Sequence, residues 1–164
     1  MTVSKASLSK ICEKILKRIR KNFPKLEKVK ISLKITKLKN YSMWAIQIRK
    51  GGYKILIDYN RYNDAKPNEI CGVLAHELIH FEDYGQRTKF CMILDRILYH
   101  FRIYRKLVER SVDKRVIGRG YGKELIANRK RMLEKASAKS LHYNRGVYML
   151  PEEIKSYAKK IGKW

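Results

Sequence analysis

The central stretch of the sequence is Pro67-Asn68-Glu69-Ile70-Cys71-Gly72-Val73-Leu74-Ala75-His76-Glu77-Leu78-Ile79-His80-Phe81-Glu82-Asp83-Tyr84. Its apolar residues recur at helical spacing, a proline opens it, and Gly85 follows it. Proline suits the first turn of a helix, and glycine commonly follows the last one. Glu69 stands near the positive end of the helix dipole, where an acid is favourable. The stretch therefore predicts one helix from Pro67 to about Tyr84.

The residues before this helix predict another helix and three strands. Positions 7–23 carry apolar residues at helical spacing. Over 29–36 apolar and polar residues alternate, as on a strand with one wet face. The segments 41–48 and 53–59 continue in this style, and Gly51-Gly52 between them suits a tight hairpin turn. We expect a helix followed by three antiparallel or mixed strands.

The residues after the central helix predict a largely helical half. Residues 90–117 have helical composition and period, with one or two breaks, and three glycines between 118 and 122 supply a stop and a turn. A basic helix is expected over 123–139, an extended stretch over 141–150, and a last short helix from Pro151. The fold class is therefore α+β.

Length and composition favour one compact domain over 1–164, with the strands and central helix in 28–85 and the helical part in 90–164. A chain of 164 residues with 45% hydrophobic residues can bury a real core. No apolar run approaches the ~20 residues of a membrane-spanning helix, and the N-terminus does not resemble a secretory signal. We expect a cytoplasmic protein without membrane contact. Cys12, Cys71 and Cys91, without CxxC spacing, are expected to be small core residues.

The charge balance is strongly basic. The chain has 39 Lys and Arg residues against 15 Asp and Glu, a formal net charge of +24. Such an excess gives nonspecific, salt-dependent affinity for nucleic acids. The basic residues are spread over the whole length, however, and heavy Lys and Ile use is also typical of a thermophile's surface.

The residues with the clearest chemical meaning are His76, Glu77 and His80, which form an HExxH motif. On a helix the two histidines lie one turn apart on one face, so both imidazoles can reach one metal ion. Glu77 is rotated by about 100° from His76 and is placed to touch a metal-bound water. A metal ion lowers the pKa of its water to roughly 7, and a glutamate can take the proton as hydroxide attacks a carbonyl. The motif predicts one zinc ion and hydrolytic chemistry.

A catalytic zinc usually has a third protein ligand, which must come from elsewhere in the chain. The downstream candidates are Asp95, His100, Glu109, Asp113, Glu124, Glu134 and His142. We favour Glu109, because Asp113 follows it four residues later on the same helical face among apolar neighbours. One carboxylate of this pair can bind metal while the other accepts the second N–H of a ligand imidazole.

HExxH followed some tens of residues later by a helix with ExxxD resembles the gluzincin metallopeptidases, and the small chain is most similar to the archaeal minigluzincins. The resemblance covers roughly residues 28–127. It implies a zincin-like fold and a zinc-dependent peptidase acting on peptides or proteins. In that family pattern His76, His80 and Glu109 are the zinc ligands, Glu77 is the general base and acid, and Asp113 holds a ligand histidine.

The resemblance also implies a substrate-holding edge strand and an oxyanion-stabilising side chain. The edge strand would lie in 41–48, at Ser42-Met43-Trp44-Ala45, and would pair with a peptide main chain. The family uses a Tyr or His against the oxyanion, for which Tyr99, His100 and His142 are the candidates.

Three other interpretations remain open in the sequence. An SprT-like protease acting on DNA-bound proteins would use His100 as third ligand. A basic nucleic-acid-binding domain would keep only a structural or vestigial metal site. Finally, residues 141–164 could cover the cleft and make the enzyme latent, or the chain could self-associate.

Overall fold

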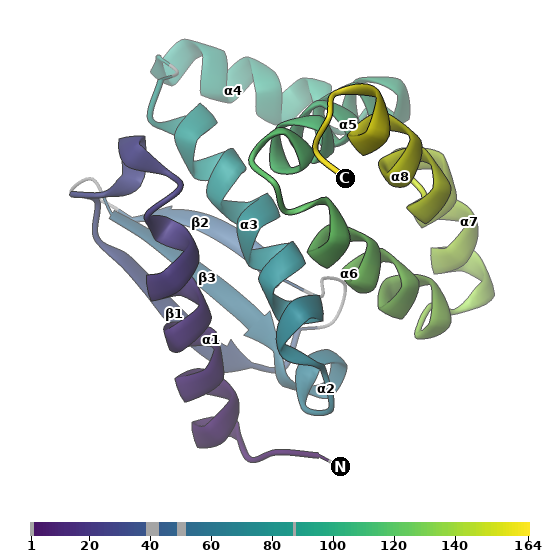
Figure 1. Cartoon of the computed structure of the whole chain (residues 1–164). Coiled ribbons are helices and arrows are strands. Elements are labelled where there is room, and N and C mark those ends of the chain that lie inside the picture. The colour runs from purple at the N-terminus through teal and green to yellow at the C-terminus, as the bar shows by residue number, and fades with distance from the viewer. Residues whose placement is uncertain (1, 39–42, 49–51, 87) are drawn as a thin grey trace.

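The structure is a computed structural model, which describes residues 2–38, 43–48, 52–86 and 88–164. The elements in chain order are α1 (Lys5–Arg20), η1 (Pro24–Leu26), β1 (Ile31–Thr36), β2 (Met43–Ile48), β3 (Gly52–Asp58), α2 (Tyr59–Tyr62), α3 (Pro67–Tyr84), α4 (Lys89–Leu98), α5 (Arg102–Gly118), α6 (Gly122–Glu134), α7 (Ala138–Val147) and α8 (Pro151–Lys160) (Figure 1). An N-terminal helix, a three-stranded sheet and a mostly helical second half confirm the α+β class.

The sheet is mixed, with strand order β1-β3-β2. Strand β3 pairs parallel to β1 and antiparallel to β2. The β2–β3 register joins Ile48 to Gly52, as an antiparallel hairpin requires, but Gly51 of the predicted turn lies outside the described residues. In this order β2 is an edge strand.

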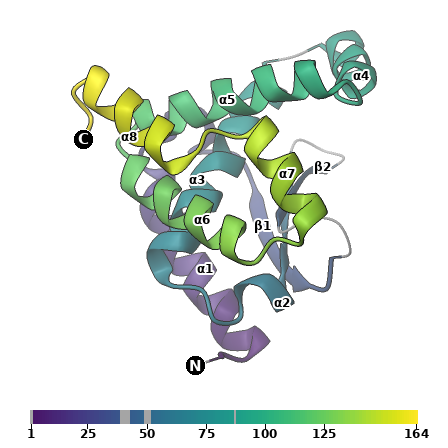
Figure 2. The ribbon, with the colours of Figure 1, turned by 90° about the vertical axis from the view of Figure 1, so that its right-hand side faces the viewer.

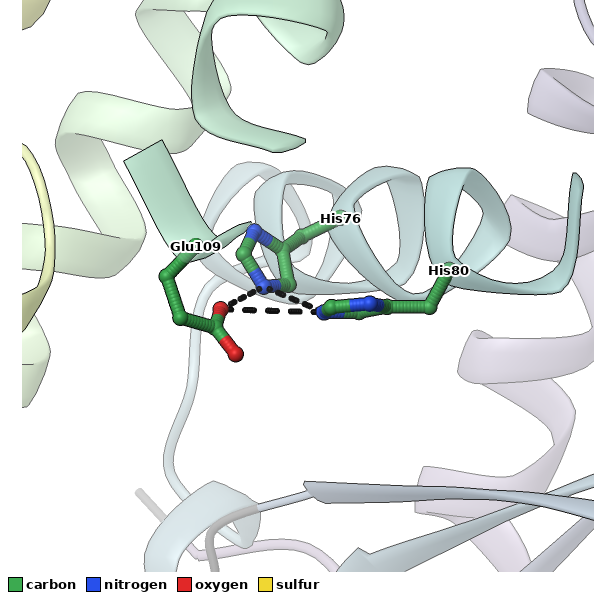
Figure 3. Close-up of side chains that lie close together, drawn as sticks. All are labelled: His76, His80 and Glu109. Atoms are coloured by element: carbon green, nitrogen blue, oxygen red, sulfur yellow. Dashed lines mark hydrogen bonds and ion pairs between the residues drawn. The ribbon is translucent and has the colours of Figure 1, made fainter. Parts of the chain in front are cut away.

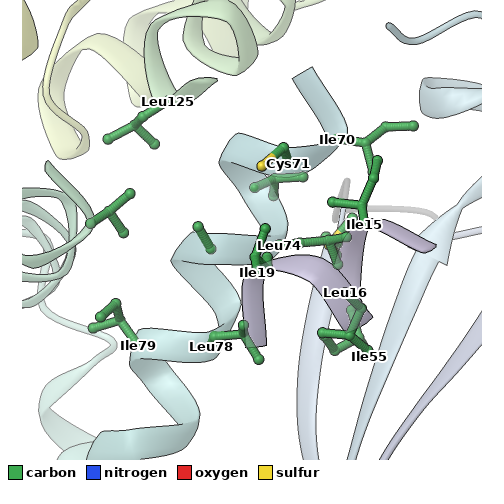
Figure 4. Close-up of a cluster of buried hydrophobic side chains, with 14 of the residues drawn as sticks. Ile15, Leu16, Ile19, Ile55, Ile70, Cys71, Leu74, Leu78, Ile79 and Leu125 are labelled. Atoms are coloured by element: carbon green, nitrogen blue, oxygen red, sulfur yellow. The ribbon is translucent and has the colours of Figure 1, made fainter. Parts of the chain in front are cut away.

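Helices α1 and α3 lie side by side over one face of the sheet (Figure 1). Figure 4 shows Ile19 of α1 and Ile55 of β3 on the side of α3 where Leu74 and Leu78 project. All four side chains are almost completely buried. The apolar stripe of α1 predicted from the sequence is thus the layer between this helix, α3 and the sheet.

Helix α3 is the centre of the molecule because helices cover its other side as well. Helix α6 packs along it most extensively, and α5 crosses it near the two histidines. Ile79 of α3 and Leu125 of α6 lie on this second side (Figure 4), and both are fully buried. A helix buried on two sides needs apolar residues around most of its circumference, which explains the unbroken run without polar side chains from Ile70 to Ala75 in α3.

Several predicted boundaries agree with the structure. Helix α3 runs from Pro67 to Tyr84 as expected, and Glu69 accepts a hydrogen bond from the backbone N–H of Lys66 at 2.7 Å. The predicted helical region 90–117 is broken once, between α4 and α5. Gly120 has φ +85°, a conformation that glycine adopts without strain, and turns the chain from α5 into α6.

The expected extended stretch over 141–150 is wrong, because most of it belongs to α7. The Ser137 side chain caps this helix by accepting from the backbone N–H of Ser140, and α7 packs on α5. The basic helix predicted over 123–139 also ends earlier, since α6 stops at Glu134 and leaves a break before α7. A local cap and a tertiary contact outweighed the weak alternation of the sequence.

The three cysteines agree only in part with their predicted place in the core. Cys12 and Cys71 are buried, as expected, but Cys91 is exposed, so its assignment to the core is wrong. Its helix, α4, presents this side to solvent instead of to the core. No helix among the described residues is long and apolar enough to cross a membrane.

Candidate metal centre

Three side chains from two helices converge at the centre of the molecule (Figure 3). His76 and His80 project from α3, and Glu109 projects from α5 toward them. His76 Nε2 lies 2.9 Å from Glu109 Oε2 and 3.2 Å from His80 Nε2. His80 Nε2 lies 3.6 Å from the same oxygen of Glu109. The three potential ligand atoms therefore point to one small volume.

The packing of α5 on α3 creates this arrangement. Glu109, Val112, Asp113 and Val116 form the buried face of α5, at the spacing of one helical stripe. Val112 and Val116 pack in the core, and the carboxylates of Glu109 and Asp113 lie next to His76. Glu109 is 2% exposed, and the His80 side chain keeps 12% of its surface exposed. The cluster is thus enclosed on most sides and open near His80.

Asp113 orients the first histidine. Its Oδ1 lies 2.9 Å from His76 Nδ1, so the ring donates this proton to the carboxylate and directs Nε2 toward Glu109. Asp113 also accepts from Arg129 Nη2 at 2.6 Å and from the backbone N–H of Met149 at 3.0 Å. Burial alone would raise the pKa of Asp113, but the Arg129 charge and the bond from His76 lower it. Asp113 is therefore a permanent acceptor.

The electrostatics of the cluster favour charge separation between its acids and His76. Burial disfavours a charged imidazole, but the hydrogen bonds to Asp113 and Glu109 outweigh it and raise the pKa of His76 to about 10. Burial would likewise raise the pKa of Glu109, yet its interactions with His80 and His76 hold this pKa well below its usual value. The buried acids thus create a site with strong affinity for positive charge.

Glu77 is buried next to this cluster. It is 8% exposed, and burial raises the pKa of its carboxyl above the ordinary value. The charges of His80 and His76 act in the opposite direction, which places its carboxylate within electrostatic reach of both rings. A glutamate with a raised pKa is a stronger base than an ordinary carboxylate.

Of the three oxyanion candidates from the sequence, only Tyr99 contacts the cluster. Its hydroxyl donates a hydrogen bond to Glu109 Oε1, the oxygen that faces away from His76. Burial and the Glu109 charge raise the pKa of Tyr99, so its proton stays in place. His100, in the connection between α4 and α5, and His142, on α7, are exposed and do not join the described ligand group.

Two further residues at the centre were missed in the sequence, Tyr148 and Arg129. The Tyr148 ring meets the edge of the His76 ring at a centroid distance of 6.1 Å. The Arg129 guanidinium lies 4.4 Å from the centroid of the Tyr148 ring while it pairs with Asp113. Burial and the nearby Glu109 charge raise the pKa of Tyr148 well above its usual value. No motif marks either residue, although Arg129 interrupts the buried stripe of α6.

The predicted substrate strand lies partly within the described residues. Ser42 is outside them, whereas Met43, Trp44 and Ala45 belong to the edge strand β2. Met43 is buried in the core and Trp44 is 48% exposed. Helix α3 packs against β2, so the edge of the sheet and the ligand helix are neighbours.

The donor set fits a zinc ion. Two imidazole nitrogens and one carboxylate oxygen lie within 4.8 Å of one another. Ligand atoms about 2.0–2.1 Å from a tetrahedral zinc are separated by roughly 3.3 Å. The separations of 2.9, 3.2 and 3.6 Å found here average close to that value. The site therefore has the spacing of an HExxH motif with a downstream glutamate and can bind one metal ion.

Comparison of the chain with protein-family models, with curated proteins and with solved structures gives no match. The functional interpretation of the centre thus rests on its geometry and its chemistry.

Proposed function

We propose that this protein is a zinc-dependent metallopeptidase of the gluzincin type. The observation that carries the proposal is the convergence of His76, His80 and Glu109, with Glu77 buried beside them. Two imidazoles and a carboxylate are the ligand set of zinc peptidases that keep one position open for water or substrate. The described cluster contains Glu109 and not His100, which favours this type over an SprT-like arrangement.

In this proposal His76, His80 and Glu109 bind the zinc ion. Hydrogen bonds with neighbouring side chains orient two of these ligands. Asp113 fixes the His76 ring from behind, and Tyr99 fixes the outer oxygen of Glu109. A bound zinc supplies Lewis acidity, which polarises a carbonyl and makes water nucleophilic at neutral pH. Helices α3 and α5 keep the three ligands close together before any ion binds, which lowers the cost of forming the site.

Glu77 is the proton carrier of the proposed reaction. Its carboxylate takes a proton from the attacking water and delivers it to the amine that leaves the peptide. The raised pKa of Glu77 supports this role, because a stronger base accepts the proton more readily. The enclosed site limits competing contact with bulk water.

In this proposal Tyr148 stabilises the charge that develops on the substrate oxygen. Its ring adjoins His76, and its raised pKa keeps the hydroxyl protonated as a donor. Arg129 beneath the ring positions it. Tyr148→Phe is therefore expected to lower kcat with little change in zinc content.

The edge strand β2 would hold the peptide in extended form by main-chain hydrogen bonds.

The decisive experiment combines metal analysis with digestion of a peptide library by wild type and Glu77→Ala. We expect the wild type to carry one zinc and to cleave, and Glu77→Ala to keep the zinc and lose cleavage. Glu109→Ala should lose most of the zinc, whereas Glu152→Ala on the exposed surface of α8 serves as the matched control and should behave as wild type. Unchanged cleavage by Glu77→Ala would contradict the mechanism.

The alternative of a basic nucleic-acid-binding domain is tested by the same samples. It predicts no peptide cleavage by the wild type, together with DNA binding that Glu77→Ala leaves unchanged. Latency through residues 141–164 needs a different test, because Tyr148 and Met149 support the centre themselves. Point substitutions in α8 are more informative than a truncation that would remove these supports.

A further inference from the structure

An exposed apolar surface lies on α4 and the first half of α5. We name it the α4–α5 patch, and its members are Phe90, Ile93, Ile97, Phe101, Ile103 and Leu107. Their exposed fractions range from 56% to 78%. Single exposed apolar residues are common on proteins, but a continuous patch of several hundred Å² marks an interaction surface.

Helix α4 is amphipathic, and the most apolar part of its described surface faces solvent. None of its side chains that the structure describes is buried. Phe90, Ile93 and Ile97 follow the three- and four-residue spacing of one helical stripe, which here faces solvent. In both views α4 lies at the upper edge of the molecule (Figure 1 and Figure 2), so the stripe is accessible to a large partner.

The sequence that carries the patch is basic. The segment 86–108 contains six Lys and Arg residues and one acid, Asp95, which accepts a hydrogen bond from the Tyr104 hydroxyl. Arg102 and Lys106 are exposed and alternate along α5 with Ile103 and Leu107 of the patch. An apolar stripe bordered by cations is typical of helices that lie at the surface of anionic lipid.

We infer that the α4–α5 patch docks the protein on an anionic lipid bilayer. The apolar side chains would enter the boundary between headgroups and acyl chains, and the neighbouring cations would meet lipid phosphates. A second copy of the chain offers apolar surface but also a net charge of +24, which opposes association. Nucleic acid offers negative charge but no apolar partner for the stripe.

Docking of this kind would overturn the expectation of a protein without membrane contact, which rested on the lack of an apolar run long enough to span a bilayer. A helix that lies in the interface needs an apolar face and not a continuous apolar run. Leu107 of the patch and Glu109 of the candidate metal centre lie two residues apart on α5 and therefore on opposite faces of this helix.

The test is flotation of the full-length protein with vesicles of phosphatidylcholine alone or mixed with phosphatidylglycerol. The variant pairs Ile93→Ser with Ile97→Ser, and the matched control pairs Ile161→Ser with Trp164→Ser, two exposed apolar residues at the other end of the chain. Circular dichroism checks that each variant is folded. None of these positions belongs to the metal centre, so the result is independent of the proposed peptidase activity.

We expect the wild type and the control to float with the anionic vesicles only, and the Ile93→Ser/Ile97→Ser variant to bind about tenfold more weakly or worse. Failure of the wild type to float, or equal binding by this variant, would overturn the proposal. A wild-type dimer that this variant converts to monomers, without vesicle binding, would identify a second copy as the partner instead.

A second readout uses Cys91, which is exposed on α4 while Cys12 and Cys71 are buried. An environment-sensitive fluorophore on Cys91 should shift its emission to the blue when anionic vesicles are added. An unshifted emission under conditions of flotation would show that another surface binds, and would also overturn the proposal.

Discussion

Asp113 connects the candidate metal centre to three different parts of the fold. It accepts hydrogen bonds from His76 on α3, from Arg129 on α6 and from the backbone of Met149 between α7 and α8. A fully buried carboxylate is costly unless it is paired, and here each oxygen has at least one partner. The same residue therefore directs a potential metal ligand and stabilises the packing of the helices around it.

Replacement of Asp113 by Asn is expected to affect both roles. The amide keeps the shape but removes the charge, so Arg129 is left buried without its ion pair. We expect a loss of about 3 kcal/mol in the free energy of unfolding, measured in urea. Zinc affinity, measured by chelator competition, should fall roughly 10–100-fold.

The matched control is Asp83→Asn, on α3 but outside the cluster. Asp83 pairs with Arg115 and keeps 21% of its side chain exposed. This variant should retain wild-type zinc affinity. Equal zinc affinities in Asp113→Asn and wild type would contradict the assigned orientation of His76.

At the level of elements, α3 and α6 approach each other closely at Gly72. A Cβ at this position would lie 2.2 Å from the carbonyl oxygen of Glu124, so the two backbones must separate to admit one. The glycine is thus required by helix packing. It costs helix propensity, but it allows α6 to carry Arg129 close to Asp113.

Gly72→Ala is expected to destabilise the protein by about 2–3 kcal/mol, despite the better helix propensity of alanine. The comparison is Gly118→Ala at the end of α5, where a Cβ meets nothing within 4 Å. That variant should be neutral or slightly more stable. Urea denaturation of the two variants and wild type gives the answer, and equal stability of both variants would contradict the close packing.

The end of α6 is held to the connection before α3 by Asp64. Its carboxylate accepts from Lys135 Nζ at 2.6 Å and from Arg131. The hydrogen bonds from Lys135 and Arg131 lower the pKa of Asp64 to about 2. Since the folded pKa lies below the ordinary value of 3.8, the contribution of Asp64 to stability is complete above pH 3.8 and disappears as the pH falls through about 2.

Asp64→Asn should therefore lower the free energy of unfolding at pH 7 by about 1 kcal/mol, a value reduced for the partial exposure of the group. The difference from wild type should shrink as the pH approaches 2. Carbon-detected NMR titration of the Asp64 carboxyl checks the cause directly. A titration midpoint near the ordinary value would remove the basis of this prediction.

In the molecule as a whole, arginine and lysine have different roles. Among the ion pairs between described residues, the cations are Arg or His except for Lys135, which pairs with Asp64. The acids in these ion pairs thus pair largely with arginine, within the fold or at the candidate centre. Most lysines instead add to the positive electrostatic potential of the surface. A net charge of +24 is therefore compatible with a buried acidic site.

A surface field of this size predicts nonspecific binding to polyanions. Duplex DNA should bind without sequence preference, and the affinity should fall by roughly a thousandfold or more between 50 and 200 mM salt. Fluorescence anisotropy with two unrelated duplexes measures both properties. Binding that resists salt, or that prefers one duplex, would indicate a dedicated nucleic-acid site and would weaken the peptidase proposal.

The structural features that could be predicted from the sequence were those with local physical causes. Periodicity, Pro67 and Gly85 defined α3, and the i, i+4 spacing placed His76 and His80 on one face, because a helix converts sequence spacing directly into position. The choice of Glu109 followed from the same rule on α5. Helix α7 was missed because its apolar residues carry no clear period and its packing on α5 decides its conformation.

Apart from α7, the sequence alone determined the order of the longer helices and the strands, the helix that carries HExxH, and the scarcity of acids outside a few positions. Only the tertiary structure decided that Glu109 faces the histidines and that Arg129 and Tyr148 stand behind them. It also decided that the stripe of α4 meets solvent. Hydrophobic spacing specifies which face of a helix is apolar, whereas the neighbour of that face depends on how every other element packs.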